Sequence, residues 1–214
     1  MNSKRALTLL HTSHPLAVAD ESTSALASPT SIDAPLLLRV QKGDGAAFRA
    51  IFDRHGPGVR RYLGDLLRDD AAADEATQET FVRAYDSLSS LRESARLQSW
   101  LFGIARNVFL EHCRARKESQ RLLAEPDEES EPVDDAPTPD AVLLHEEAER
   151  VLTEALTHVG EPRKSALLLR LDHGLSYEDI SAVMGWPVSK VKNEIHRARL
   201  QLRAQLSRYL GGSK

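Results

Sequence analysis

Hydrophobic residues recur at helical spacing from about Asp33 to Lys117 and again from about Ala141 onward. The clearest apolar stripe leads into a run of basic residues and consists of Trp100, Leu101, Ile104, Ala105, Val108 and Phe109. The helical stretches are poor in glycine and rich in Leu, Ala, Arg and Glu, and aromatic residues make up only 5% of the 214 residues. This pattern predicts an all-α protein.

Breaks in the pattern divide the chain into four segments. Residues 1–31, rich in Ser, Thr, Ala and His and without periodicity, are expected to form a flexible tail. A helical domain is expected over 32–117, with breaks at Gly43-Asp-Gly45, at Gly56-Pro-Gly58 and over the polar stretch 87–94. Residues 118–140 form a flexible acidic linker by composition, and 141–210 form a second small helical domain.

The acidic linker changes the meaning of the net charge, which is formally −4. Eight acids and no Lys or Arg lie between Glu125 and Asp140, together with four prolines. Without these acids the rest of the chain would carry about +4, concentrated in 106–117 and 190–203. Because a local field, not the total charge, attracts phosphates, the composition is compatible with nucleic-acid binding.

The second domain ends in a pattern typical of a helix-turn-helix, after expected helices over about 143–156 and 162–171. Ser176 is expected to cap one helix, with Asp179 reaching back to its backbone N–H, and Gly185 to end it. Pro187 prevents simple continuation. In the following helix one stripe is apolar: Val191, Ile195, Ala198 and Leu202. The residues that point away from this stripe are Lys190, Asn193 and Arg197, flanked by Lys192, His196 and Arg199.

Several other classes of protein are disfavoured. No stretch approaches the roughly 20 apolar residues of a membrane span, and His11 and Pro15 interrupt any signal-peptide core, so a cytoplasmic protein is expected. The single cysteine, Cys113, excludes an internal disulfide and a cysteine-based zinc cage, and we expect an inert thiol. No nucleophile elbow, phosphate loop or metal motif indicates an enzyme, a cofactor or a catalytic residue.

Two helical units joined by a tether, with the helix-turn-helix last, resemble the extracytoplasmic-function (ECF) class of sigma-70-type transcription initiation factors. Three ordered motifs carry the resemblance. Asp74-Glu-Ala-Thr-Gln78-Glu79-Thr-Phe81-Val-Arg83-Ala-Tyr85 is similar to the family's helix that docks on the polymerase clamp. Ser99-Trp-Leu-Phe-Gly-Ile-Ala-Arg-Asn107 is similar to the segment that engages the minus-10 promoter element. The two helices of the helix-turn-helix resemble the minus-35 reader.

The resemblance implies a sigma factor that binds core RNA polymerase through its β′ clamp and β subunits, recognises both promoter elements and melts the minus-10 region. The implied polymerase-binding residues are Asp74, Gln78, Glu79 and Arg83. The implied minus-10 contacts are Arg92, Arg96, Gln98, Ser99, Arg106, Asn107, Arg114 and Lys117. The implied minus-35 contacts are Lys190, Lys192, Asn193, His196, Arg197 and Arg199. An anti-sigma factor that covers these faces is a further implied partner.

Two places depart from the family pattern, of which one is Ala76-Thr77, smaller and more polar than the family's usual Leu-Val. Glu194 stands in the recognition helix where relatives commonly have Arg. A carboxylate at that position is expected to be repelled by DNA unless it accepts a hydrogen bond from a cytosine amino group.

The sequence leaves two other functions open. The chain could be a helix-turn-helix regulator that never serves as a sigma subunit, although such a regulator needs no clamp-docking helix at 74–85. It could also be a helical adaptor without a DNA role, against which the basic recognition helix argues.

Overall fold

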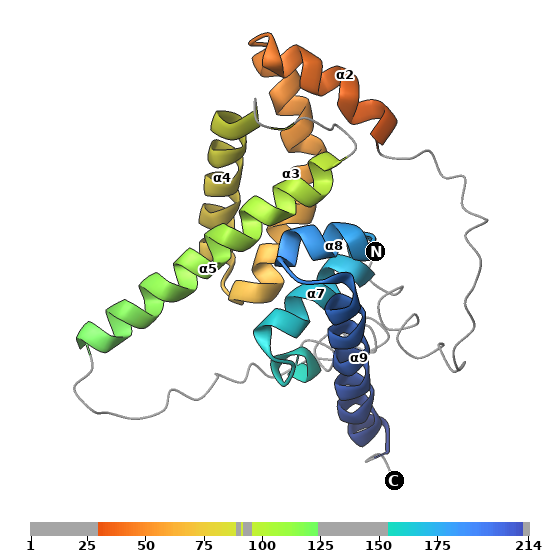
Figure 1. The fold of residues 1–214 in the computed structure, drawn as a ribbon. Helices are drawn as coiled ribbons and strands as arrows, with labels where there is room; N and C mark the ends of the chain where they lie inside the picture. Colours follow the sequence, from red (N-terminus) through yellow and green to blue (C-terminus); the bar gives the residue numbers. More distant parts are fainter. Residues whose placement is uncertain (1–29, 89–90, 92–95, 124–153, 212–214) are drawn as a thin grey trace, which may run out of the picture.

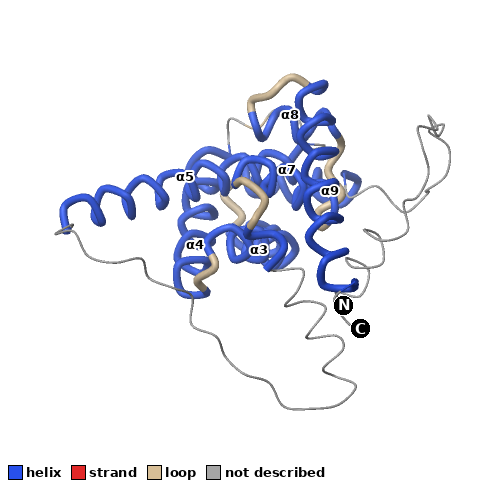
Figure 2. Tube along the Cα trace, turned by 90° about the horizontal axis from the view of Figure 1, so that it is seen from below, coloured by secondary structure: helices blue, strands red, loops and turns tan. Residues whose placement is uncertain are grey.

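The computed structural model describes residues 30–88, 91, 96–123 and 154–211, and this part of the chain contains helices and loops but no strand (Figures 1 and 2). The prediction of an all-α fold is confirmed. The helices are α2 (Thr30–Gln41), α3 (Gly45–Leu67), α4 (Asp70–Ser87), α5 (Leu97–Leu123), α7 (Glu161–Leu171), α8 (Tyr177–Met184) and α9 (Val188–Gly211). The expected tail before residue 30 and the acidic linker lie outside the described residues.

Helices α2 to α5 form the first unit, in which α3 packs against α2, α4 and α5. The expected break at Gly43-Asp-Gly45 is confirmed, because Asp44 caps α3 by accepting from the N–H of Ala46 at 2.9 Å. A second break, between α3 and α4, was not predicted. There Arg68 adopts a left-handed conformation with φ of 58°, and Asp69 caps α4.

The break expected at Gly56-Pro-Gly58 is wrong, because α3 continues through it. Proline removes only one backbone hydrogen bond, and burial of Val59, Tyr62 and Leu63 just beyond it favours continuation of the helix. Neither glycine is required by space. An added Cβ would lie at ordinary contact distance, 3.6 Å from the Phe52 ring at Gly56 and 3.7 Å from the His173 ring at Gly58.

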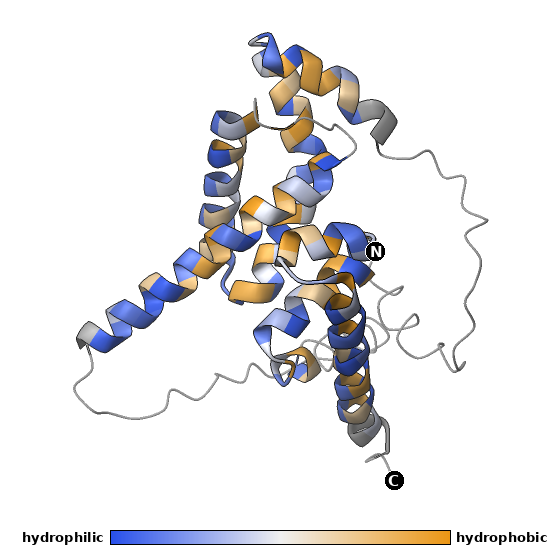
Figure 3. Cartoon of the chain, viewed as in Figure 1, coloured by the Kyte–Doolittle hydropathy of each residue, from blue (hydrophilic) through white to orange (hydrophobic). Residues whose placement is uncertain are grey.

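Helix α5 follows the predicted stripe. Four of its six residues are buried, namely Leu101, Ala105, Val108 and Phe109, while Trp100 and Ile104 are half-buried. Figure 3 shows hydrophilic residues along the outer end of α5, which extends beyond the body of the protein. The core therefore holds α5 as far as Cys113, and every described side chain from Arg114 to Arg121 is exposed.

Helices α7, α8 and α9 form the second unit. Helices α7 and α8 agree with the predicted ranges within one or two residues, whereas α9 starts two residues before the expected basic helix 190–203 and continues to Gly211. The earlier helix expected over 143–156 falls mostly outside the described residues. The two units lie against each other, with α7 packed on α3 and α8 packed on α5. Since both units close around one continuous set of buried residues, the described chain is compact despite its two parts.

Candidate nucleic-acid and protein interfaces

The turn between α8 and α9 has the local chemistry that the sequence indicates. The N–H of Asp179 donates to the Ser176 hydroxyl at 3.0 Å, and Gly185 adopts a left-handed conformation with φ of 66°. One detail differs from expectation. The Asp179 carboxylate accepts from the Ser176 hydroxyl at 2.6 Å, not from its backbone N–H. The hydroxyl thus serves as acceptor and donor at once, which fixes the start of α8.

Helix α9 buries the predicted apolar stripe and exposes the predicted polar one. Val191, Ile195, Ala198 and Leu202 are all buried. Of the six candidate contacts, Lys190, Lys192, Asn193, His196 and Arg197 are exposed and Arg199 is half-buried. The Nζ atoms of Lys190 and Lys192 lie above the rings of Trp186 and Tyr177, 4.5 Å and 5.3 Å from the ring centres. Rigid aromatic supports therefore hold two of the cations near the turn.

Glu194 lies between two arginines. Its Oε1 accepts from the Nη1 of Arg197 at 3.1 Å, and its Oε2 accepts from the Nε of Arg163 on α7. The hydrogen bond from Arg163 is the main reason that the pKa of Glu194 is lowered. The carboxylate is therefore ionised and already neutralised within the protein, which the sequence alone did not predict.

The candidate minus-10 residues are spread along α5. Arg96, Asn107, Arg114 and Lys117 are exposed, Gln98 and Arg106 are half-buried, and Ser99 is buried. Ser99 donates to the carbonyl of Arg96 at 3.1 Å, and Gln98 donates from Nε2 to the carbonyl of His173 at 3.2 Å. Arg92 lies outside the described residues. The first turns of α5 are thus in contact with the second unit.

A cavity of about 570 Å³ lies between the start of α5 and the helix-turn-helix. Its α5 wall includes Arg96, Ser99, Trp100, Arg106 and Asn107, and its other wall is formed by 182–185. The Nε of Arg106 is buried and has no hydrogen-bond partner in the part of the chain that the structure describes. Trp100, interpreted from the sequence as a core residue, packs half-buried against the core and also lines this cavity.

A larger groove of about 790 Å³ runs between α3 and α4. Aromatic rings form its floor, with Phe52 and Phe81 edge to face at 4.8 Å and Phe48 and Tyr85 at 5.0 Å. Val82 and Tyr85 are about half exposed there, at 55% and 54%. Two candidate polymerase contacts line the groove, Asp74 and Gln78, together with the acids Asp53 and Asp86 and one cation, Arg60, which donates to Asp74 at 2.5 Å. An apolar groove whose lining has more acids than cations suits a helix with an apolar face and basic flanks.

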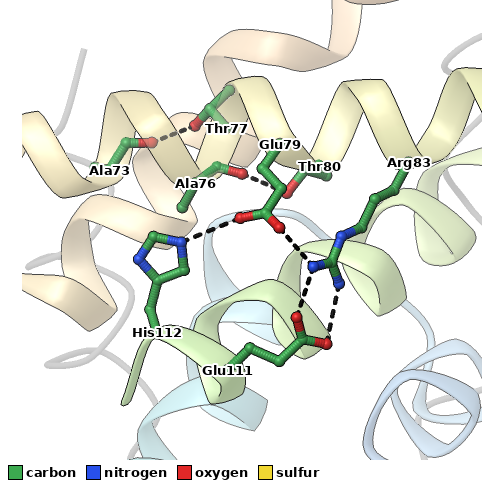
Figure 4. Close-up of polar contacts among 8 residues, drawn as sticks. All are labelled: Ala73, Ala76, Thr77, Glu79, Thr80, Arg83, Glu111 and His112. Carbon is green, nitrogen blue, oxygen red and sulfur yellow. Dashed lines mark hydrogen bonds and ion pairs between the residues drawn. The ribbon is translucent and has the colours of Figure 1, made fainter. Parts of the chain in front are cut away.

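The other two candidate polymerase contacts lie in a network between α4 and α5 (Figure 4). Both terminal nitrogens of Arg83 donate to Glu111, at 3.0 Å and 2.6 Å, and Nη2 also donates to Glu79 at 2.5 Å. His112 contacts the second oxygen of Glu79 at 3.2 Å. Arg83 lowers the pKa of Glu111 by hydrogen bonding. Glu79 and Arg83 therefore join two helices of the first unit.

Polar contacts between buried residues join the two units. The Tyr62 hydroxyl lies 2.5 Å from that of Ser165, and both residues are fully buried. The Nζ of Lys164 donates to the carbonyl of Asp65 at 2.7 Å. The ring of His173 packs against Phe102 with centres 4.4 Å apart. The sequence analysis missed these residues and Arg163, although helical spacing with Val59 and Leu63 marks Tyr62 as a core position.

The described residues include one cysteine and no cluster of metal-ligating side chains. Cys113 is half-buried, and burial raises the pKa of its thiol, in keeping with the expected inert role. Among the described residues no three His, Cys, Asp or Glu side chains gather as a metal site would require. None of the helices described is long and apolar enough to cross a bilayer.

Two sigma-70 families match the chain in the order of its two units. The family described as sigma-70 region 2 matches residues 51–119, and that described as sigma-70, region 4 matches residues 149–202. The first match contains most of the groove and most of α5, and the second contains α7, α8 and more than half of α9.

Several sigma factors are similar to this chain in sequence or in structure. An ECF RNA polymerase sigma-E factor of Haemophilus influenzae is 35% identical over 174 residues, which are 78% of this chain and 91% of the relative. An RNA polymerase sigma-H factor of Pseudomonas aeruginosa is 31% identical, with 78% and 90% covered. Among solved structures, the sigma factor RpoE in complex with the anti-sigma factor NepR from Bartonella quintana matches with a TM-score of 0.62 and 25% identity. That match covers 75% of this chain and 96% of the other. CnrH in complex with the cytosolic domain of CnrY matches with a TM-score of 0.61 and 25% identity, covering 82% and 97%.

Proposed function

The chain belongs to the ECF class of the sigma-70 family, and from this premise we propose how its residues bind polymerase and promoter DNA. It is a sigma factor that binds core RNA polymerase, recognises the minus-35 and minus-10 elements and melts the minus-10 region. The observation that carries this function is the helix-turn-helix, whose second helix buries one stripe and presents five exposed polar or basic residues on the other.

Minus-35 recognition is assigned to α9. Lys190, Lys192, Asn193, His196, Arg197 and Arg199 form the contact set. Asn and Arg can bond base edges in pairs, whereas Lys acts mainly on phosphates. The aromatic supports under Lys190 and Lys192 suit these two residues to fix the position of the helix on the backbone.

Minus-10 recognition is assigned to α5 and the loop before it, through Arg92, Arg96, Gln98, Ser99, Arg106, Asn107, Arg114 and Lys117. Melting needs no bond-making by the protein. It needs a surface that binds separated strands well enough to offset a few kcal/mol for each base taken out of the stack. The cavity beside Trp100 and half-buried Arg106 has the chemistry to receive such a base, because the indole lines its wall and the buried Nε of Arg106 has no partner among the described residues.

Polymerase docking is assigned to the groove between α3 and α4, with a clamp helix of the β′ subunit as its occupant. Asp74 and Gln78 would contact that helix directly, and the acids Asp53 and Asp86 complement basic flanks. Glu79 and Arg83 would act by holding α4 against α5 through Glu111. Of the four candidates, Asp74 and Gln78 are thus proposed to contact polymerase directly, and Glu79 and Arg83 to act indirectly through the position of α4.

Further parts of the function follow from its partners. Sigma factors are not themselves enzymes, and we assign no catalytic residue, metal or cofactor. A protein that works on polymerase and chromosomal promoters acts in the cytoplasm. Since the similar RpoE and CnrH structures are complexes, the first with the anti-sigma factor NepR and the second with the cytosolic domain of CnrY, we propose that an anti-sigma factor covers the groove or the DNA-binding faces of this chain as well.

The test is transcription with purified components. The full chain is mixed with core polymerase and a genomic fragment library, and transcript starts are mapped with and without it. A sigma factor yields dependent starts that share two spaced upstream motifs. A regulator that never replaces a sigma subunit yields none with core polymerase alone, and that result would overturn the proposal.

A further inference from the structure

We propose that Glu194 is a positioning residue that orients Arg197 for promoter reading and recruits Arg163, from outside the helix-turn-helix, to the same site. The inference rests on the proposed function. It concerns a residue pair that the motif does not contain, because Arg163 lies in the first turn of α7 and Glu194 in the second turn of α9.

The geometry places a carboxylate under two cations. The Glu194 side chain is only 14% exposed, whereas that of Arg197 is 61% exposed and that of Arg163 is 34% exposed. Glu194 therefore lies beneath the surface while both guanidinium groups reach it. A carboxylate in this position bonds its neighbours and has little area left to meet DNA.

The charges around Glu194 explain how a carboxylate can lie on a DNA-reading helix without repelling DNA. Arg163, Arg197 and Lys190 all stabilise its ionised form. Three cations around one anion leave the cluster positive, so phosphates are attracted despite the carboxylate. The carboxylate instead limits how freely the cations move, since it holds one N–H donor of each arginine.

A held arginine reads bases better than a free one. A guanidinium has five N–H donors in a planar fork, so one bond to Glu194 leaves donors for a base edge or a phosphate. Preorganisation lowers the entropy lost when the side chain meets the correct base. Glu194 thereby increases discrimination between bases and weakens nonspecific binding of the helix to DNA.

The test compares Glu194→Gln with Glu178→Gln in the full chain. Both variants remove one negative charge from the helix-turn-helix, but Glu178 is exposed on α8 and outside the cluster. Holoenzymes carrying each variant are measured on a promoter library with every minus-35 base substituted, over a range of salt concentrations. We expect Glu194→Gln to lower discrimination at one or two positions by about tenfold while nonspecific binding strengthens. Glu178→Gln should leave the preferences unchanged.

Arg163→Ala completes the test. If Arg163 acts through Glu194, the double variant discriminates no worse than the poorer single variant. Equal preferences for Glu194→Gln and Glu178→Gln would overturn the inference. That outcome is distinct from failure of the proposed function, in which the wild-type chain supports no transcription with core polymerase.

Discussion

The Tyr62 hydroxyl on α3 and the Ser165 hydroxyl on α7 lie 2.5 Å apart in the middle of the contact between the two units, although 103 positions separate them in sequence. Burial raises the pKa of the Tyr62 phenol, because ionisation would leave a phenolate without water. A neutral phenol is therefore required by the folded state.

The raised pKa of Tyr62 predicts alkaline destabilisation. In the unfolded chain tyrosine ionises near pH 10, so its contribution to stability is complete below that pH and lost above it, by about 1.4 kcal/mol per pH unit. Thermal unfolding from pH 8 to 11 should show a steeper fall for wild type than for Tyr62→Phe. Lys164, whose pKa is lowered by burial, is present in both proteins, so its opposite effect cancels. Parallel curves would contradict the prediction.

The two kinds of polymerase contact predict different mutant behaviour. Gln78→Ala removes an exposed groove side chain and should weaken holoenzyme assembly without changing the melting temperature. Arg83→Ala should weaken assembly and also lower the stability of the first unit by about 1 kcal/mol, because three bonds to Glu79 and Glu111 are lost. Titration with core polymerase and calorimetry measure the two effects. If Arg83→Ala weakened assembly without any loss of stability, its role would be direct.

Arg197 is predicted to act on DNA alone. Arg197→Ala should reduce dependence on the minus-35 sequence by about tenfold or more in transcription, because a base contact is worth roughly 1–3 kcal/mol. Arg61→Ala, which removes an exposed arginine from α3, serves as the control for charge. Equal promoter dependence in the two variants would remove Arg197 from the contact set.

The turn of the helix-turn-helix is predicted to require glycine for its backbone and not for space. An added Cβ would meet no atom within 4 Å at either Gly185 or Gly103, but only Gly185 has a positive φ, of 66°. Gly185→Ala should therefore cost about 1–2 kcal/mol of stability, whereas Gly103→Ala, inside α5, should be neutral or stabilising. Denaturant unfolding of both variants provides the comparison.

Local patterns predicted the helices well because caps and apolar stripes act over a few residues. Ser176, Gly185 and the stripe from Val191 to Leu202 all have the expected roles. Gly56-Pro-Gly58 misled the prediction, since burial on both sides of Pro57 outweighs the missing hydrogen bond. The turn at Arg68 was missed because a left-handed arginine carries no sequence signal.

The sequence predicted which residues form the candidate site but not which side chains from different helices contact one another. Spacing indicated that α9 would expose Lys190, Asn193 and Arg197, and all three are exposed. Spacing could not indicate that Arg163, 31 positions earlier, would neutralise Glu194, since that pairing depends on how α7 crosses α9. The same holds for Lys164 and the end of α3, which meet only when the units close.

The outer end of α5 has a consequence for how promoter contacts are made. Every side chain from Arg114 to Arg121 is exposed, so only its own hydrogen-bond ladder stabilises this end among the described residues. Short unsupported helices are marginal in water, and amide hydrogens there should exchange far faster than those around Val108. Arg114 and Lys117, which we propose as promoter contacts, are thus carried on an arm that can unwind or stiffen, and we expect phosphate binding to stiffen it.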